Sequence, residues 1–187
     1  SSRCQRIALG PDTPDGGRIL WMAHHGDSWV DEPQLWTVKR TADGLIETVD
    51  HVSDPSVLFE GLDYYEDRLY IAAHGGGLRI YDVAADGKPI FNRAIGGFDN
   101  ALKVHVVDGY AHVIDKDMLR IVDISDISTA DIEGTYPLAG IAWDVYVHGD
   151  RVYVALGSQG VEVLDRSQPT NLTQIALLDL GGSSQAV

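Results

Sequence analysis

The sequence contains a single cysteine, Cys4, among 187 residues. One cysteine excludes a framework of internal disulfides and leaves open only a bond to another chain. Positive charge is also scarce, because 14 Lys and Arg face 28 Asp and Glu for a formal charge of −14. Nucleic acids and anionic membrane surfaces are bound through clustered Lys and Arg, so neither is an expected partner. No apolar run approaches the roughly 18 residues of a membrane helix, and we expect no membrane span.

The residues that are abundant indicate a β protein. Apolar residues make up 44% of the chain, enough for a hydrophobic core in one domain or in part of a larger one. Twenty glycines and clusters of β-branched and aromatic residues, as at 145–147 and 152–154, are typical of short strands and turns. No segment shows the 3.6-residue periodicity of an amphipathic helix, which argues against an α/β fold.

An internal repeat organises the chain. Residues 67–72 (DRLYIA) match 150–155 (DRVYVA), and 78–82 (LRIYD) match 161–165 (VEVLD), both 83 positions later. A copy halfway between them ends in LRIVD, so that Asp82, Asp123 and Asp165 follow each other at steps of 41 and 42. A looser first copy starts at Arg18 and carries about seven extra residues at 26–33.

Each copy contains four short β segments separated by turn residues. In the third copy we expect strands at 102–107, 110–114, 118–124 and 132–136, the first two joined by a tight Asp-Gly turn. The fourth copy predicts strands at 143–148, 151–156, 160–165 and 172–178. In the first copy the opening strand should cover 6–9, followed by a turn at 10–17.

The period and the burial pattern together predict an all-β fold. Apolar residues occupy both parities of strands such as 69–72, so these sheets should be covered on both faces. Four strands in every 40–45 residues are typical of a β-propeller of four-stranded antiparallel blades. A plain sandwich would not explain the steps of 41 and 42. We expect a single propeller portion over 1–187, with blades at about 5–52, 59–96, 101–137 and 142–180.

The remaining residues, 181–187, are expected to start a further blade or to form a tail. A four-bladed ring with a tail and a portion of a larger ring are both compatible with the sequence. The second is favoured, because an open row of blades would leave a strand edge and an apolar face in water. A second polypeptide or the remaining blades would then complete the ring.

The strings LRIVDISD at 119–126 and GVEVLD at 160–165 resemble the LVIVD repeat. The resemblance covers about residues 60–187 and is poor in the first copy, where Lys39 replaces the strand-ending Asp. It implies a propeller of the kind expected in bacterial and archaeal secreted or surface proteins. A secreted, periplasmic or cell-surface location is therefore expected from the resemblance. No catalytic motif is shared by the family, so none is carried over.

The loops at one end of a propeller channel are the expected place for a functional site. Two histidines at equivalent places in neighbouring blades, with carboxylates nearby, could act as acid and base or bind a divalent metal ion. The candidate catalytic residues are His24, His25, His74, Asp115 and Asp144. The candidate metal ligands are His24 and His74, although histidines that only satisfy hydrogen bonds of the turns are the favoured alternative. Structural packing is expected instead for His105, His112 and His148.

The same face supplies candidate ligand-binding residues, which are Trp29, Glu60, Lys103, Trp143 and Gln185. The tryptophans could stack on a sugar or another flat ligand, although Trp143 could as well be buried between blades. Three functional hypotheses follow. The favoured one is a propeller module that binds a small-molecule or protein ligand. The second is an enzyme of the lyase or hydrolase type, and the third is one chain of a split, two-chain propeller whose chemistry lies partly on missing blades.

Overall fold

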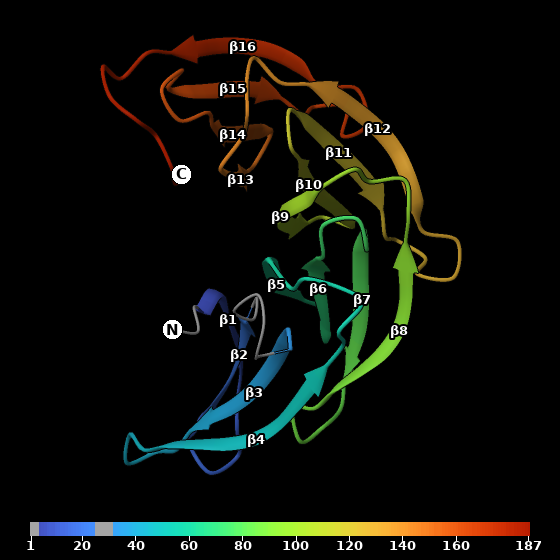
Figure 1. Ribbon diagram of the computed structural model, residues 1–187, viewed down its shortest axis with the longest axis vertical. Coiled ribbons are helices and arrows are strands. Elements are labelled where there is room, and N and C mark those ends of the chain that lie inside the picture. The colour runs from blue at the N-terminus through green and yellow to red at the C-terminus, as the bar shows by residue number, and fades with distance from the viewer. Residues whose placement is uncertain (1–3, 25–31) are drawn as a thin grey trace.

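The computed structural model describes residues 4–24 and 32–187, and these fold into sixteen strands without a helix (Figure 1). The strands are β1 (Cys4–Asp12), β2 (Arg18–His24), β3 (Gln34–Arg40), β4 (Ile46–Ser53), β5 (Gly61–Tyr65), β6 (Arg68–Ala72), β7 (Leu78–Val83), β8 (Pro89–Ile95), β9 (Ala101–Val107), β10 (Tyr110–Asp115), β11 (Met118–Asp123), β12 (Asp131–Pro137), β13 (Asp144–His148), β14 (Arg151–Ala155), β15 (Val161–Asp165) and β16 (Thr173–Leu178). Within this part of the chain no helix is long and apolar enough to cross a membrane.

The strands form four antiparallel sheets of four consecutive strands each. We call them sheets 1 to 4, from β1–β4 to β13–β16. In Figure 1 they stand side by side in an arc, with β1, β5, β9 and β13 innermost and β4, β8, β12 and β16 outermost. The arc does not close, because sheets 1 and 4 leave a gap between them in that view. The predicted all-β class and four-stranded antiparallel sheets are confirmed, whereas a closed ring is not present.

The sheets span 4–53, 61–95, 101–137 and 144–178, and the strands predicted for the third and fourth copies lie within one or two residues of the observed ones. The first copy was predicted less well. Its opening strand runs to Asp12 instead of ending at 9, because β1 stays paired with β2 beyond an irregularity between Leu9 and Asp12. Asp12 lies opposite Arg18 and accepts a 2.8 Å hydrogen bond from its Nε. The turn expected at 10–17 is correspondingly shorter.

Hydrophobic cores fill the three spaces between neighbouring sheets. The second strands of the middle sheets are buried on both sides, as in β10, where every residue after Tyr110 is buried. This agrees with the two-parity apolar pattern of the sequence. Sheets 1 and 4 have a neighbour on one side only, and large apolar side chains remain exposed there, including Ile7 and Leu9 of β1 and Leu178 of β16. The four sheets therefore leave part of their large apolar side chains exposed to water.

Equivalent glycines shape the turns between the second and third strands of sheets 2 and 4. Gly77 and Gly160, 83 positions apart like the rest of the repeat, have φ angles of +73° and +88°. A Cβ atom at Gly77 would overlap the carbonyl oxygen of Ile95, the last residue of β8. A Cβ atom at Gly160 would overlap that of Leu178, the last residue of β16. Glycine is required there both by the left-handed backbone and by this close approach. These turns lie at the end of the molecule that the sequence predicts to be functional.

Candidate functional site

The innermost strands β1, β5, β9 and β13 all border on the centre of the arc (Figure 1). Charged side chains on these strands, or directly beside them, pair with one another. They come from all four sheets. We call them the axial cluster, and its members are Arg6, Glu60, Asp63, His74, Lys103, His105 and Asp144. Glu60 lies directly before β5 and His74 follows β6, so the strands deliver these residues to one end of the sheets.

Glu60 joins two cations of the cluster. Its carboxylate lies 3.5 Å from His74 Nε2 and 3.9 Å from Lys103 Nζ, and the side chains of all three are at least 74% buried. On the other side of the imidazole ring, His74 Nδ1 lies 2.5 Å from the side-chain oxygen Oδ1 of Asn100. The carboxylate of Glu60 and, to a smaller extent, the side chain of Asn100 favour the protonated ring, and they raise the pKa of His74 above its usual value. Burial acts in the opposite direction but does not cancel this effect. Burial lowers the pKa of Lys103, and the charge of Glu60 opposes that effect.

Two further charge pairs connect inner strands. One joins sheets 1 and 4, and the other joins sheets 2 and 3. Arg6 of β1 lies 3.4 Å from the buried carboxylate of Asp144 in β13. Asp63 of β5 lies 3.7 Å from His105 Nδ1 and accepts a 2.7 Å hydrogen bond from the Val106 N–H. Burial raises the pKa of Asp63, so this carboxyl group is harder to ionise than an exposed one. Charge pairs thus connect strands that share no backbone ladder.

The structure brings together four of the candidates, namely Glu60, His74, Lys103 and Asp144. Asp115 is not among the ion pairs of the axial cluster: its carboxylate is 2% exposed and accepts hydrogen bonds from Arg120 Nε at 2.8 Å and from the Asn100 N–H at 2.6 Å. These are the contacts of a group that supports the fold. Its predicted acid–base role stays a prediction.

The remaining candidates are dispersed or not described. His24 ends β2 and is half-buried. His25 and Trp29 lie outside the described residues. Gln185 is exposed, and it directly follows Ser184, which forms an isolated β-bridge with Gly157. Trp143 is 50% exposed and lines a pocket beside β13. Residues 4–24 and 32–187 contain no group of three or more His, Cys, Asp or Glu able to hold a metal ion. The metal role of His24 and His74 stays a prediction.

Three members of the axial cluster were not predicted from the sequence, namely Arg6, Asp63 and His105. A signal for two of them exists. The sequence places Lys103 at the start of an inner strand, and His105 lies two residues later on the same face of that strand. Asp63 likewise lies two residues after Gly61, at the start of β5. His105, which was expected to be a packing residue, does pack edge-on against Tyr146 with ring centroids 5.0 Å apart, but it also faces Asp63.

Comparison with known proteins identifies the repeat. The LVIVD repeat profile matches residues 99–137 and 139–177, which contain sheets 3 and 4. No curated protein sequence matches the chain. Among solved structures, a functionally unknown protein from Desulfotomaculum acetoxidans is similar with a TM-score of 0.67 at 12% identity, over 91% of this chain and 55% of that one.

A protein of unknown function from Bacteroides caccae is similar with a TM-score of 0.66, also at 12% identity, over 96% of this chain and 62% of that one. At this identity the likeness concerns the fold alone. The chain spans between 55% and 62% of the length of these two structures.

Proposed function

Two consecutive LVIVD repeats match residues 99–137 and 139–177, which contain sheets 3 and 4. We propose that this chain is a β-propeller module that binds a small polar ligand at the centre of its innermost strands. The axial cluster carries the proposal. Charged groups cost free energy when they are taken out of water, and the hydrophobic cores between the sheets do not need them. Their gathering from all four sheets at the centre of the arc is best explained by a ligand that they bind.

Lys103 is the residue on which we expect the ligand to depend most. Its side chain is 18% exposed, and the Glu60 carboxylate lies 3.9 Å from Nζ, which is beyond hydrogen-bond distance. An ammonium group in this position can donate hydrogen bonds to a carboxylate or carbonyl oxygen of a ligand. The buried carboxylate of Asp144 offers the opposite charge nearby. The cluster therefore suits a small zwitterion, such as an amino acid, better than a simple anion.

The test is a titration followed by NMR on the isotope-labelled protein, with glutamate, succinate and putrescine as probes. We expect glutamate to shift the backbone amides of 60–63, 101–105 and 144–146 most strongly. Lys103→Met should weaken that response at least about tenfold, as expected for the loss of a charged hydrogen bond. Lys88→Met is the matched control, because Lys88 pairs with the exposed Asp86 at the edge of the molecule. Equal responses of the two variants, or shifts at peripheral amides only, would contradict the proposal.

We also propose that further four-stranded sheets cover the open faces of sheets 1 and 4 and complete a ring, whether they belong to a second polypeptide or to the same one. The exposed side chains of Ile7, Leu9 and Leu178, between 48% and 60% accessible, support this. So does the greater length of the two similar structures, which are matched over 55% and 62%. A secreted, periplasmic or cell-surface location is proposed on the resemblance to LVIVD-repeat proteins alone.

Ring completion is tested by the mass of the particle purified from its natural source. We expect a mass well above the 20.3 kDa of one such chain, with all sheets accounted for by one or two polypeptides. Binding of a hydrophobic dye should be weak in that particle and strong in the isolated 187-residue chain, because only the latter exposes both end faces. A single 20.3 kDa chain in the natural particle would refute the proposal.

A further inference from the structure

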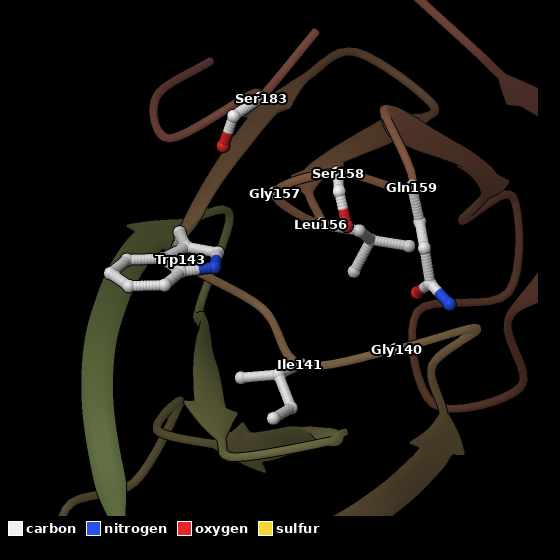
Figure 2. Close-up of a pocket in the computed structure, with 8 residues that line it drawn as sticks. All are labelled: Gly140, Ile141, Trp143, Leu156, Gly157, Ser158, Gln159 and Ser183. Atoms are coloured by element: carbon white, nitrogen blue, oxygen red, sulfur yellow. The ribbon is translucent and has the colours of Figure 1, made fainter.

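A pocket of about 530 Å³ lies beside β13, apart from the contacts of the axial cluster. Three segments form it: the loop at 140–143, the turn at 156–160 between β14 and β15, and the C-terminal segment at Ser183. Figure 2 shows the indole of Trp143 and the carboxamide of Gln159 on opposite sides of the pocket, with Ile141 projecting between them. Its volume is in the range of pockets that hold small molecules.

Backbone hydrogen bonds hold the three segments in place. The N–H of Trp143 donates to the Ala155 carbonyl at 2.8 Å, which fixes the loop on β14. Gly157 and Ser184 exchange two backbone hydrogen bonds of 2.8 Å, which place the C-terminal segment against the turn. Gly157 has a φ of +60°, and a Cβ atom there would lie 2.9 Å from the Trp143 indole nitrogen. The absent side chain therefore lets the turn approach the indole.

Gly140 lies on the side of the pocket opposite Trp143, next to Gln159. A Cβ atom at this position would lie where the side-chain oxygen of Gln159 now sits, so glycine lets this exposed, flexible side chain keep that position. The Gln159 side chain is thereby placed over the loop, with its amide at the rim of the pocket (Figure 2). The left-handed backbone of Gly157 and the backbone hydrogen bonds of the three segments, more than Gly140, are what favour a pocket formed before a ligand arrives.

The chemistry of the lining restricts what can bind. None of the eight lining residues shown in Figure 2 carries a charge. Trp143 and Ile141 are 50% and 58% exposed, so a flat apolar surface faces water at the site. Amide and hydroxyl groups, from Gln159, Ser158 and Ser183, provide both donors and acceptors around it. The matching ligand is uncharged, has one apolar flat face and carries several hydroxyl groups at its edge.

We propose that this pocket binds the ring of a neutral sugar. The C–H face of the ring packs on the Trp143 indole, which offers a large rigid apolar surface. The hydroxyls at the edge of the ring exchange hydrogen bonds with the Gln159 carboxamide and the hydroxyls of Ser158 and Ser183. The proposal is independent of the axial cluster, since no charged group takes part. Binding should therefore be insensitive to salt and to pH between about 5 and 8.

Saturation-transfer NMR with maltose, cellobiose and N,N′-diacetylchitobiose tests the proposal. We expect at least one of the three to receive saturation at its ring C–H protons. Trp143→Ala should weaken that binding more than about tenfold, because the stacking surface is lost. Gln159→Leu keeps the size of the side chain and should weaken it by about two- to tenfold, as expected for neutral hydrogen bonds.

Two controls separate this site from others. Trp36→Ala removes a tryptophan of β3, which stacks on His51 at 5.0 Å and lies outside the pocket, and should leave sugar binding unchanged. Lys103→Met should also leave it unchanged, so that failure of the axial-cluster proposal and failure of this one are distinguishable. No saturation transfer to any of the three sugars overturns the proposal. So does equal binding by Trp143→Ala, or stronger binding of the aromatic probe indole than of every sugar.

Discussion

Replacing Asp115 with alanine is expected to lower the free energy of unfolding by about 3–5 kcal/mol, the range found when one partner of a buried ion pair is removed. The Asp115 carboxylate accepts hydrogen bonds from Arg120 Nε at 2.8 Å and from the N–H groups of Asn100 and Asp99 at 2.6 and 3.3 Å. These donors belong to β11 and to the segment that leads from sheet 2 into β9. The substitution leaves all of them without their acceptor.

The conservative variant separates charge from shape. Asp115→Asn keeps one oxygen acceptor but loses the negative charge facing Arg120, and we expect about half the effect of alanine. Asp117→Ala is the matched control, because Asp117 is exposed two residues later in the same turn. It should change stability by less than about 0.5 kcal/mol. Unfolding in urea, followed by circular dichroism, measures all three variants. Similar midpoints for Asp115→Ala and Asp117→Ala would show that the carboxylate does not support the fold.

The repeat explains why the strands could be predicted so closely. Each copy must bury the same faces against its neighbours, so turns and apolar residues recur at steps of 41 and 42. Gly77 and Gly160 show the same constraint at the level of one backbone angle. The prediction failed in the first copy, where β1 continues to Asp12. That extension depends on a single cross-strand pair with Arg18, and no repeated residue signals it.

The axial cluster was predicted in part, and for an identifiable reason. The sequence places residues at the start of each inner strand, which is how Glu60, Lys103 and Asp144 were found. Extending the alternation of the strand by two residues would have added Asp63 and His105. Which of these groups meet could not be predicted, because Arg6 and Asp144 are 138 residues apart and belong to sheets that share no ladder. That contact is set by the curvature of the whole arc.

His112 shows a departure from the repeat that the sequence does reveal. The equivalent positions in sheets 2 and 4 are Ile71 and Val154, both fully buried. His112 is also 0% exposed, and neither of its ring nitrogens has a hydrogen-bond partner among the described residues. The prediction that it is a packing residue agrees with this burial. An imidazole in an aliphatic position carries a cost, because its polar atoms are removed from water without compensation.

That cost should appear as a dependence of stability on pH. Burial, with a smaller effect from the charge of Arg166, lowers the pKa of His112 from 6.5 to about 3 in the folded protein. Between these values the unfolded chain binds a proton that the folded chain does not, so stability is full above pH 6.5 and is lost as the pH falls. The loss is about 1.4 kcal/mol per pH unit, or about 2 kcal/mol between pH 7 and pH 5.

The variant His112→Val should remove this slope and raise stability at pH 5, because valine is the residue at the equivalent position in sheet 4. Urea unfolding at pH 7, 6, 5.5 and 5 measures the slope above the range in which carboxylates titrate. His74 has a raised pKa in the folded protein, so its own effect on stability runs in the opposite direction and is lost as the pH rises. It is present in every variant, so the difference between His112→Val and the original protein at each pH isolates the contribution of His112. His148→Val, at an exposed position of β13, is the control and should keep the slope of the original protein. An unchanged slope in His112→Val would mean that the buried ring accepts a proton without unfolding the sheets around it.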